Sequence, residues 1–198
     1  MKLTAVAILK WNGEKEPLLF GMAADLSTFG FFQRGSVKEM LTFVSRTVAK
    51  RTQPGTRQTV QHEEYYCHAH NRDGLVGVAF VDKDYPSRAA FSVVDKVLDD
   101  YSDHSRNAWR AAAEDSGDAL VVLDPAIVKY QDPAQADKLT KIQRDLDETK
   151  IVLHKTIESM LERGEKLEAL VDKSSDLSMA SQMFYKQARK TNSCCKLM

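Results

Sequence analysis

The sequence predicts an α+β domain followed by one long helix. Short apolar runs separated by turn residues indicate five strands within the first 132 of the 198 residues. One stretch between these runs and one after the last of them show the spacing of amphipathic helices, so we expect a sheet sandwiched by helices. Beyond Pro133 there is no further proline and one glycine, which favours helix up to the tail. The expected segments are 1–132, 137–192 and 193–198.

The first two expected strands form a hairpin. They span residues 2–9 and 16–23, and the Asn12-Gly13 pair between them is a strong hairpin signal. Residues 56–82 predict three more strands, and the last of these is apolar enough to be buried. Beyond Pro133 we expect no strand.

Two helices interrupt or follow these strands. Ser36 and Glu39 fit a capping box, which predicts a helix over residues 37–51. Ser87 opens a second long helix, and a further helix is expected near 125–131, after a short apolar strand or turn.

The composition excludes several classes of protein. The formal net charge is zero, so no overall positive field attracts nucleic acid. Three cysteines are too few for a disulfide framework and indicate a reducing compartment. No apolar run approaches the length that spans a bilayer. Lys10 interrupts the apolar start, which therefore fits a first strand better than a secretory signal.

The helical segment carries a seven-residue repeat. We call its members the stripe; they are separated by alternating steps of three and four, the spacing of a left-handed coiled coil. The stripe consists of Leu139, Ile142, Leu146, Thr149, Leu153, Thr156, Met160, Arg163, Leu167, Leu170, Ser174, Leu177, Ser181, Phe184, Ala188 and Thr191. Its serines, threonines and alanine are small, so larger residues from partner helices are needed to fill those layers.

Arg163 is the one charged member of the stripe. Burying an unpaired guanidinium would cost several kcal/mol, so acceptor oxygens must surround it. A homomeric parallel coil would stack like charges, and we therefore expect a heteromeric bundle rather than a homo-oligomer. The alternative, an arginine at the edge of a simple surface helix, fits poorly with a repeat of this length. Gly164 weakens the helix by ~1 kcal/mol relative to alanine.

The run E-S-M-L-E-R-G-E-K-L-E-A-L around Arg163 resembles the core of the synaptobrevin-type R-SNARE motif. The order of elements before it resembles a longin (profilin-like) domain with a five-stranded antiparallel sheet. The whole chain is similar to the lipid-anchored longin R-SNAREs of secretory and vacuolar traffic, which lack a transmembrane helix. This resemblance implies that Arg163 faces glutamines from three Gln-SNARE helices, syntaxin-like and others. The resulting bundle would fuse vesicles in ER–Golgi, endosomal and vacuolar transport.

The last four residues, Cys195 to Met198, form a C-a-a-X box whose methionine favours farnesyl. Lys196 departs from the usual aliphatic residue. Use of the box removes residues 196–198 and, by resemblance, leaves Cys195 as a methyl ester. One lipid binds membranes only marginally, and Cys194 is placed for a second, reversible palmitoyl chain. We therefore expect the protein in the cytosol and, when lipidated, on the cytoplasmic face of Golgi, vesicle and vacuolar or endosomal membranes.

Phe43 lies off the apolar face of its helix. It either belongs to an interaction surface or packs under another element of its own domain. The resemblance implies that the longin domain folds its own SNARE segment and lipid against such a surface. The resulting hypothesis is a closed, autoinhibited form.

Other chemistry has weak support. Cys67, His68 and His70, with His62, do not provide four convergent ligands, so we expect no metal, and no cofactor motif is present. Phosphorylation of Ser174 or Ser181 would place about two negative charges in a packed layer of the bundle and block its assembly. The leading interpretation is a fusion protein, and the alternative is a prenylated adaptor whose longin domain recruits trafficking partners. An enzyme that transfers acyl groups onto Cys194 is a third class, but no catalytic constellation supports it.

Overall fold

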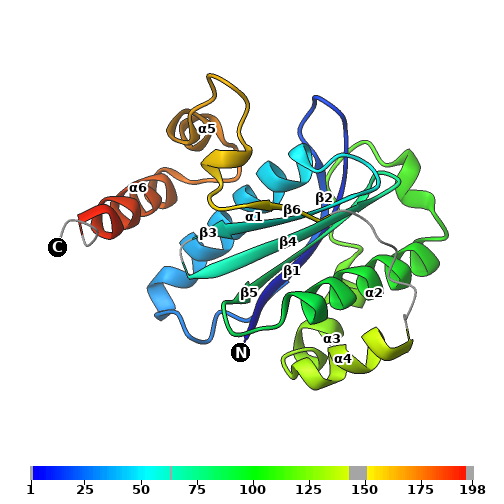
Figure 1. The fold of residues 1–198 in the computed structure, drawn as a ribbon. Coiled ribbons are helices and arrows are strands. Elements are labelled where there is room, and N and C mark those ends of the chain that lie inside the picture. Colours follow the sequence, from blue (N-terminus) through cyan, green and yellow to red (C-terminus); the bar gives the residue numbers. More distant parts are fainter. Residues whose placement is uncertain (1, 63, 143–150, 195–198) are drawn as a thin grey trace.

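The computed structural model describes residues 2–62, 64–142 and 151–194, and it is built on one six-stranded sheet (Figure 1). The strand order is β2-β1-β5-β4-β3-β6. The first five strands pair antiparallel, as expected, and β6 adds to the edge of β3 in parallel. The strands are β1 (Leu3–Lys10), β2 (Leu18–Ala24), β3 (Thr56–His62), β4 (Tyr65–Arg72), β5 (Leu75–Asp82) and β6 (Ile151–His154).

The hairpin predicted from Asn12-Gly13 is confirmed. β1 pairs with β2 from Lys10 opposite Leu18, and Gly13 has a φ of +65°, which glycine adopts without steric cost. From Ala5 on, side chains of β1 alternate between the two faces of the sheet, with Val6 and Ile8 in one core and Ala5, Ala7 and Leu9 in the other. Leu3 joins the core of Val6 because the register shifts between Leu3 and Ala5. The sheet is therefore buried on both faces.

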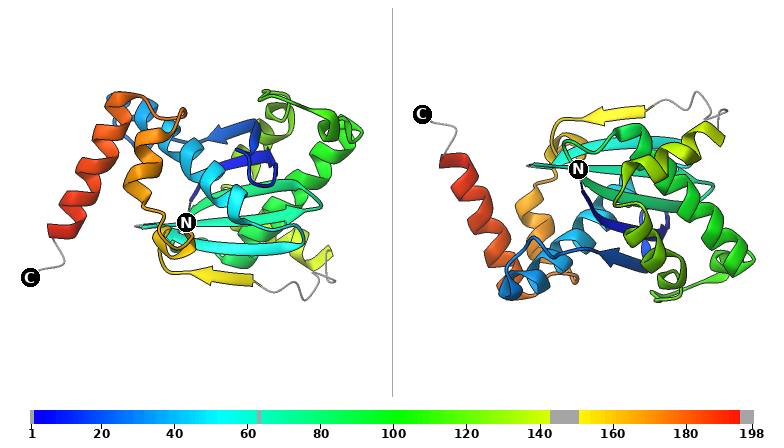
Figure 2. Two further views of the ribbon diagram at one scale, coloured as in Figure 1. Left: turned by 90° about the horizontal axis from the view of Figure 1, so that it is seen from above. Right: turned by 90° about the horizontal axis from the view of Figure 1, so that it is seen from below.

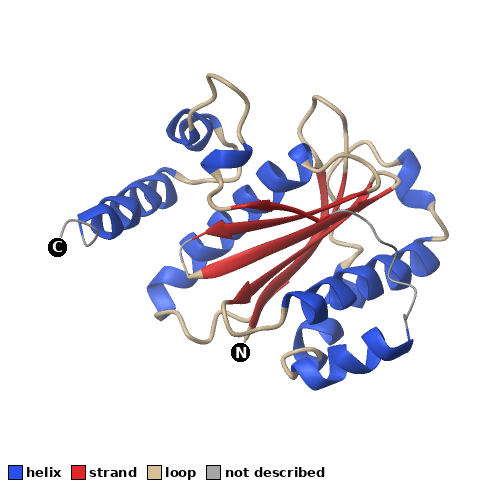
Figure 3. Cartoon of the chain, in the orientation of Figure 1, coloured by secondary structure: helices blue, strands red, loops and turns tan. Residues whose placement is uncertain are grey.

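Helices cover the two faces, as the secondary-structure colouring shows (Figure 3). The first face carries α2 (Ser87–Ser105), α3 (Leu120–Lys129) and α4 (Pro133–Ile142), and the second carries α1 (Arg34–Arg51). Two short 3-10 helices, η1 (Phe31–Gln33) and η2 (Ala108–Ala111), lie in the connections. The helix expected to open at Ser87 is confirmed. Its apolar residues, such as Phe91 and Leu98, pack on the sheet.

Two local predictions about helix starts are wrong. Ser36 does not cap α1, because η1 leads the chain directly into the helix at Arg34, and no side chain caps the helix. The carboxylate of Glu39 accepts a hydrogen bond from the distant amide of Ser178 instead. The stretch before residue 125 is helical, not a strand or turn. It begins α3 at Leu120, because Leu123 packs into the core at helical spacing with Ala126 and Ile127.

The segment beyond α4 is not one uninterrupted helix. It contains β6, the 3-10 helix η3 (Glu158–Met160), α5 (Leu167–Lys173) and α6 (Met179–Cys194). The expectation of no strand beyond Pro133 is also wrong, since β6 pairs with β3. With no partner helices present, the apolar side chains of the segment bury against the domain, and the free edge of β3 takes up backbone hydrogen bonds. Both views of Figure 2 show α5 and α6 beside α1, away from α2.

Candidate interaction surface

The second core joins α1 to the segment beyond residue 150. Phe43 is 5% exposed and contacts the ring of Tyr185 edge to face, with the ring centroids 6.3 Å apart. The Tyr185 ring also stacks on the His62 ring, with the ring centroids 5.9 Å apart. Phe43 thus packs against the chain's own C-terminal segment. The buried residues that the segment contributes are Ile157, Met160, Leu167, Val171, Leu177 and Tyr185.

Arg46 of α1 lies in the middle of this contact. It is buried, and its Nε lies 2.8 Å from a carboxylate oxygen of Asp176 in the segment between α5 and α6. Its other nitrogens bind Asp115, in the loop before α3, and the carbonyl of Pro17. Burial raises the pKa of Asp176, and Arg46 offsets only part of this effect. Burial also acts to raise the pKa of Asp115, but bonds from Arg46 and the Leu19 amide lower it overall.

Two further polar contacts flank Arg46 along α1. Toward the start of the helix, the Glu39 carboxylate accepts a hydrogen bond from the Ser178 amide at 2.8 Å. Hydrogen bonds lower the pKa of Glu39, the largest effect coming from Ser181 and the next from Ser178. Toward the end, Arg51 donates to both carboxylate oxygens of Glu165 at 2.7 and 2.8 Å, and this contact lowers the pKa of Glu165. The segment is therefore held by one charged side chain near each end of α1.

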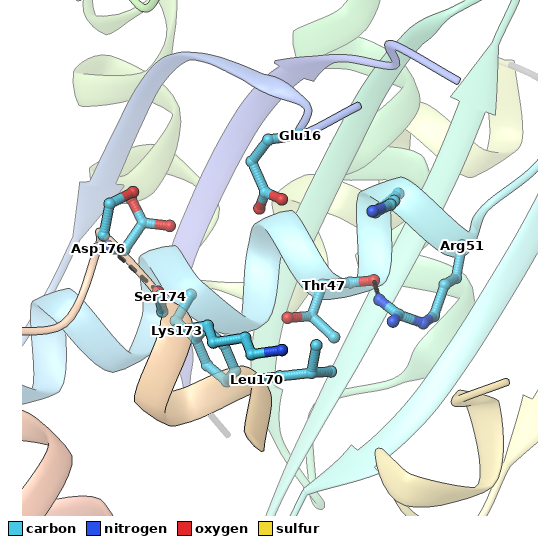
Figure 4. A pocket seen from close by; sticks show the side chains of 10 residues that line it. Glu16, Thr47, Arg51, Leu170, Lys173, Ser174 and Asp176 are labelled. Atoms are coloured by element: carbon cyan, nitrogen blue, oxygen red, sulfur yellow. Dashed lines mark hydrogen bonds between the residues drawn. The ribbon is translucent and has the colours of Figure 1, made fainter. Parts of the chain in front are cut away.

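A cavity of about 290 Å³ remains between α1 and α5 (Figure 4). Thr47 and Arg51 of α1 face Leu170 and Lys173 of α5 across it. Its lining is mixed in charge, with Glu16 and Asp176 beside Lys50, Arg51 and Lys173.

The structure divides the stripe among different environments. Met160, Leu167, Leu177 and Ser181 are buried against the domain, while Leu170, Ser174, Phe184 and Ala188 are half-buried. Leu153 is 68% exposed and Arg163 is also exposed, so no continuous apolar seam is formed. Leu139 and Ile142 fall in α4, and Leu146 lies outside the described residues.

The ion pair of Arg46 with Asp176 and three buried residues of the segment were not predicted from the sequence. Ile157, Val171 and Tyr185 are each at most 2% exposed, and each directly follows a member of the stripe. Together they form a second apolar line beside the stripe, which we call the offset line. The signal that could have identified it is an apolar residue recurring next to the stripe.

The histidines of β4 have structural partners. His68 shares a hydrogen bond with Thr59 and packs on Phe91, and His70 pairs with Asp95, so both face α2 while Cys67 lies in the other core. Burial lowers the pKa of His68 to about 4 and raises that of the Cys67 thiol. Within the described ranges, no group of three or more His, Cys, Asp or Glu side chains is arranged to hold a metal.

The lipidation candidates lie at the end of α6. Cys194 is its last residue, and Cys195 falls outside the described part of the chain. None of the helices that the structure describes is long and apolar enough to cross a membrane.

Comparison with known families defines the class of protein. The model of the longin, or Regulated-SNARE-like, domain matches residues 26–119, and the synaptobrevin model matches residues 138–197. The fold and these matches describe a longin domain followed by an R-SNARE segment.

Individual relatives agree over the full length. The chain is 60% identical over 199 residues to the VAMP-like protein YKT61 of Arabidopsis thaliana, and 48% identical over 202 residues to the synaptobrevin homolog YKT6 of Saccharomyces cerevisiae. Both comparisons cover all of both chains. The chain belongs to the synaptobrevin family of longin-domain R-SNAREs, which are non-enzymatic proteins of vesicle traffic.

Proposed function

We propose that the segment 137–192 supplies one helix to a four-helix bundle, in which Arg163 faces glutamines from three Gln-SNARE helices. The observation that carries this proposal is the division of the stripe in the present structure. Leu153 and Arg163 face solvent while Met160 and Leu167 face the domain, although all four would share one face if the segment were a continuous helix. Only part of the repeat is buried in this conformation, and a bundle would use all of it.

The conformation described here is then the closed, autoinhibited form. Contacts of α1 with α5 and α6 bury Leu167, Leu177 and Ser181, which the bundle needs in its core. Partner helices cannot reach these side chains until the segment leaves residues 1–132. Phe43 supports this proposal because it is buried by the segment and by its Tyr185 ring.

Attachment to membranes follows from the tail, residues 193–198. Farnesyl on Cys195, with removal of residues 196–198 and methylation, gives weak membrane binding, and palmitoyl on Cys194 makes it stable. α6 ends at Cys194, so a bundle that zippers through α6 approaches the lipids directly. We place this fusion protein in transport between ER, Golgi, endosome and vacuole.

Arg163 provides the test. Purified wild-type protein, mixed with candidate Gln-SNARE helices, should gain helicity by circular dichroism and form a complex that resists detergent. Arg163→Ala should lower the melting temperature of that complex or change its register, because the central glutamines lose their charged donor. Lys166→Ala, at an exposed site off the stripe, is the matched control.

An adaptor that recruits partners through its longin domain would bind them equally well with Arg163→Ala. Equal complex formation by the wild type and Arg163→Ala, with every set of partner helices that binds, would overturn the bundle proposal.

A further inference from the structure

Gly164 adopts a conformation that other residues rarely take. Its φ is +93°, and it occupies the third position of a turn in which the amide of Glu165 donates to the carbonyl of Glu162 at 3.0 Å. A positive φ at this position is typical of a type II turn, which favours glycine. A β-carbon added at Gly164 would meet no heavy atom within 4 Å. Backbone conformation, and not space, therefore explains why glycine stands here.

The turn is tied to the domain. The Glu165 carboxylate accepts a hydrogen bond from the Glu162 amide at 2.8 Å, and it also binds Arg51 of α1. The turn reverses the chain between η3, which buries Met160, and α5, which buries Leu167. Arg163, the second residue of the turn, is held in solvent. The left-handed residue is thus part of what keeps Arg163 out of a helix.

The same residue would lie within a helix in the bundle. There its φ would be near −63°, and glycine is the least favourable residue after proline. Glycine at position 164 thus favours the closed form twice, since it fits the turn and weakens the helix. We propose that Gly164 is the hinge that sets the balance between the closed and the bundle-forming conformations, an inference that rests on the function proposed above.

Two substitutions at this site separate the two effects. Alanine disfavours the left-handed turn and favours helix, so Gly164→Ala should increase the open-to-closed ratio of the full chain roughly tenfold. Asparagine visits the left-handed region most readily among residues with a side chain, so Gly164→Asn should change the ratio much less. Gly164→Ala should also raise the equilibrium constant for assembly of the bundle about threefold to fivefold, because alanine is more stable than glycine within a helix.

The opening ratio can be measured by hydrogen exchange of the amides in β6 and α5, which the closed form protects. Gly55→Ala is the matched control, since Gly55 has a φ of +77° and equally open surroundings but lies in the turn before β3. It should lower the melting temperature of the domain without selectively exposing β6 and α5. Phe43→Glu serves as the reference for an opened chain.

Faster exchange in Gly164→Ala than in Gly164→Asn, with Gly55→Ala close to wild type in β6 and α5, supports the hinge. Wild-type exchange in Gly164→Ala, together with fast exchange in Phe43→Glu, would refute the hinge and leave autoinhibition intact. If Phe43→Glu also exchanges like the wild type, the closed form is not a switch and both proposals fail.

Discussion

At the scale of single residues, Arg46 joins two parts of the molecule. Asp115 belongs to the longin domain, and Asp176 belongs to the segment that leaves it in the function proposed above. When Asp176 departs, Asp115 and the Pro17 carbonyl still satisfy the guanidinium. The contact can therefore open without leaving a buried unpaired charge in the domain, which would be costly.

The two carboxylates should have different effects when removed. Asp176→Ala should weaken closure by about 1 kcal/mol, a roughly fivefold rise in the open form, because a charge-assisted bond is lost while the desolvation of a half-buried carboxylate is relieved. Asp115→Ala should instead lower the free energy of unfolding of the domain, since Arg46 and the Leu19 amide lose their acceptor. Hydrogen exchange of α5 and thermal melting separate these effects. Identical behaviour of the two variants would contradict this assignment.

His68 should make the stability of the domain depend on pH. Burial lowers its pKa to about 4 from 6.5, so between these values the unfolded chain binds a proton that the folded chain does not. Its contribution is complete above pH 6.5 and is lost as the pH falls toward 4, with a slope of about 1.4 kcal/mol per pH unit. Urea unfolding at several pH values measures this slope. His68→Gln should flatten it, whereas His104→Gln, at an exposed site, should not.

At the scale of elements, the C-terminal segment has two overlapping faces for two partners. The whole stripe serves the expected bundle and part of it also packs on the domain, whereas the offset line of Ile157, Val171 and Tyr185 packs on α1 and the sheet. On α6 these functions fall on neighbouring residues. Phe184 belongs to the stripe and is half-buried, while Tyr185 is 2% exposed.

Adjacent substitutions on α6 should therefore act in opposite ways. Tyr185→Ala should destabilise the closed form by about 3 kcal/mol, because a buried aromatic ring is lost, and leave the bundle near wild type. Phe184→Ala should lower the melting temperature of the bundle and change closure much less. Hydrogen exchange of the free chain and melting of the complex test each half. If Tyr185→Ala weakens the bundle as much as Phe184→Ala does, the two faces are not distinct.

At the scale of the whole molecule, the sequence predicted the elements whose signals are local. The Asn12-Gly13 hairpin and the helix from Ser87 depend on neighbouring residues, and both are present. The break of the long helix, β6 and the role of Glu39 depend on residues far along the chain, such as Ser178. A stripe that suits partner helices also suits burial against the domain, so its periodicity alone cannot show which partner is engaged.

The closed form predicts where the protein resides in the cell. Phe43→Glu would bury an unpaired carboxylate against Tyr185, so the segment should be released and the chain should move from cytosol to membranes. Phe32→Glu is the control, since Phe32 is 96% exposed and its replacement should leave fractionation unchanged. Tyr185→Ala should also favour the open form, because it removes the partner of Phe43 in the C-terminal segment. Unchanged fractionation of both Phe43→Glu and Tyr185→Ala would contradict autoinhibition.

The parallel pairing of β6 with β3 has a consequence for protein handling. Three of the four side chains of β6 are exposed, so β6 is held chiefly by its main chain. When β6 leaves, residues 57–60 of β3 lose their hydrogen-bonding partners. β3 then becomes an exposed edge strand, with which strands of other molecules can pair. Open chains that have not bound partner helices should therefore tend to aggregate, and return of the C-terminal segment to its own domain should help to keep the protein in solution.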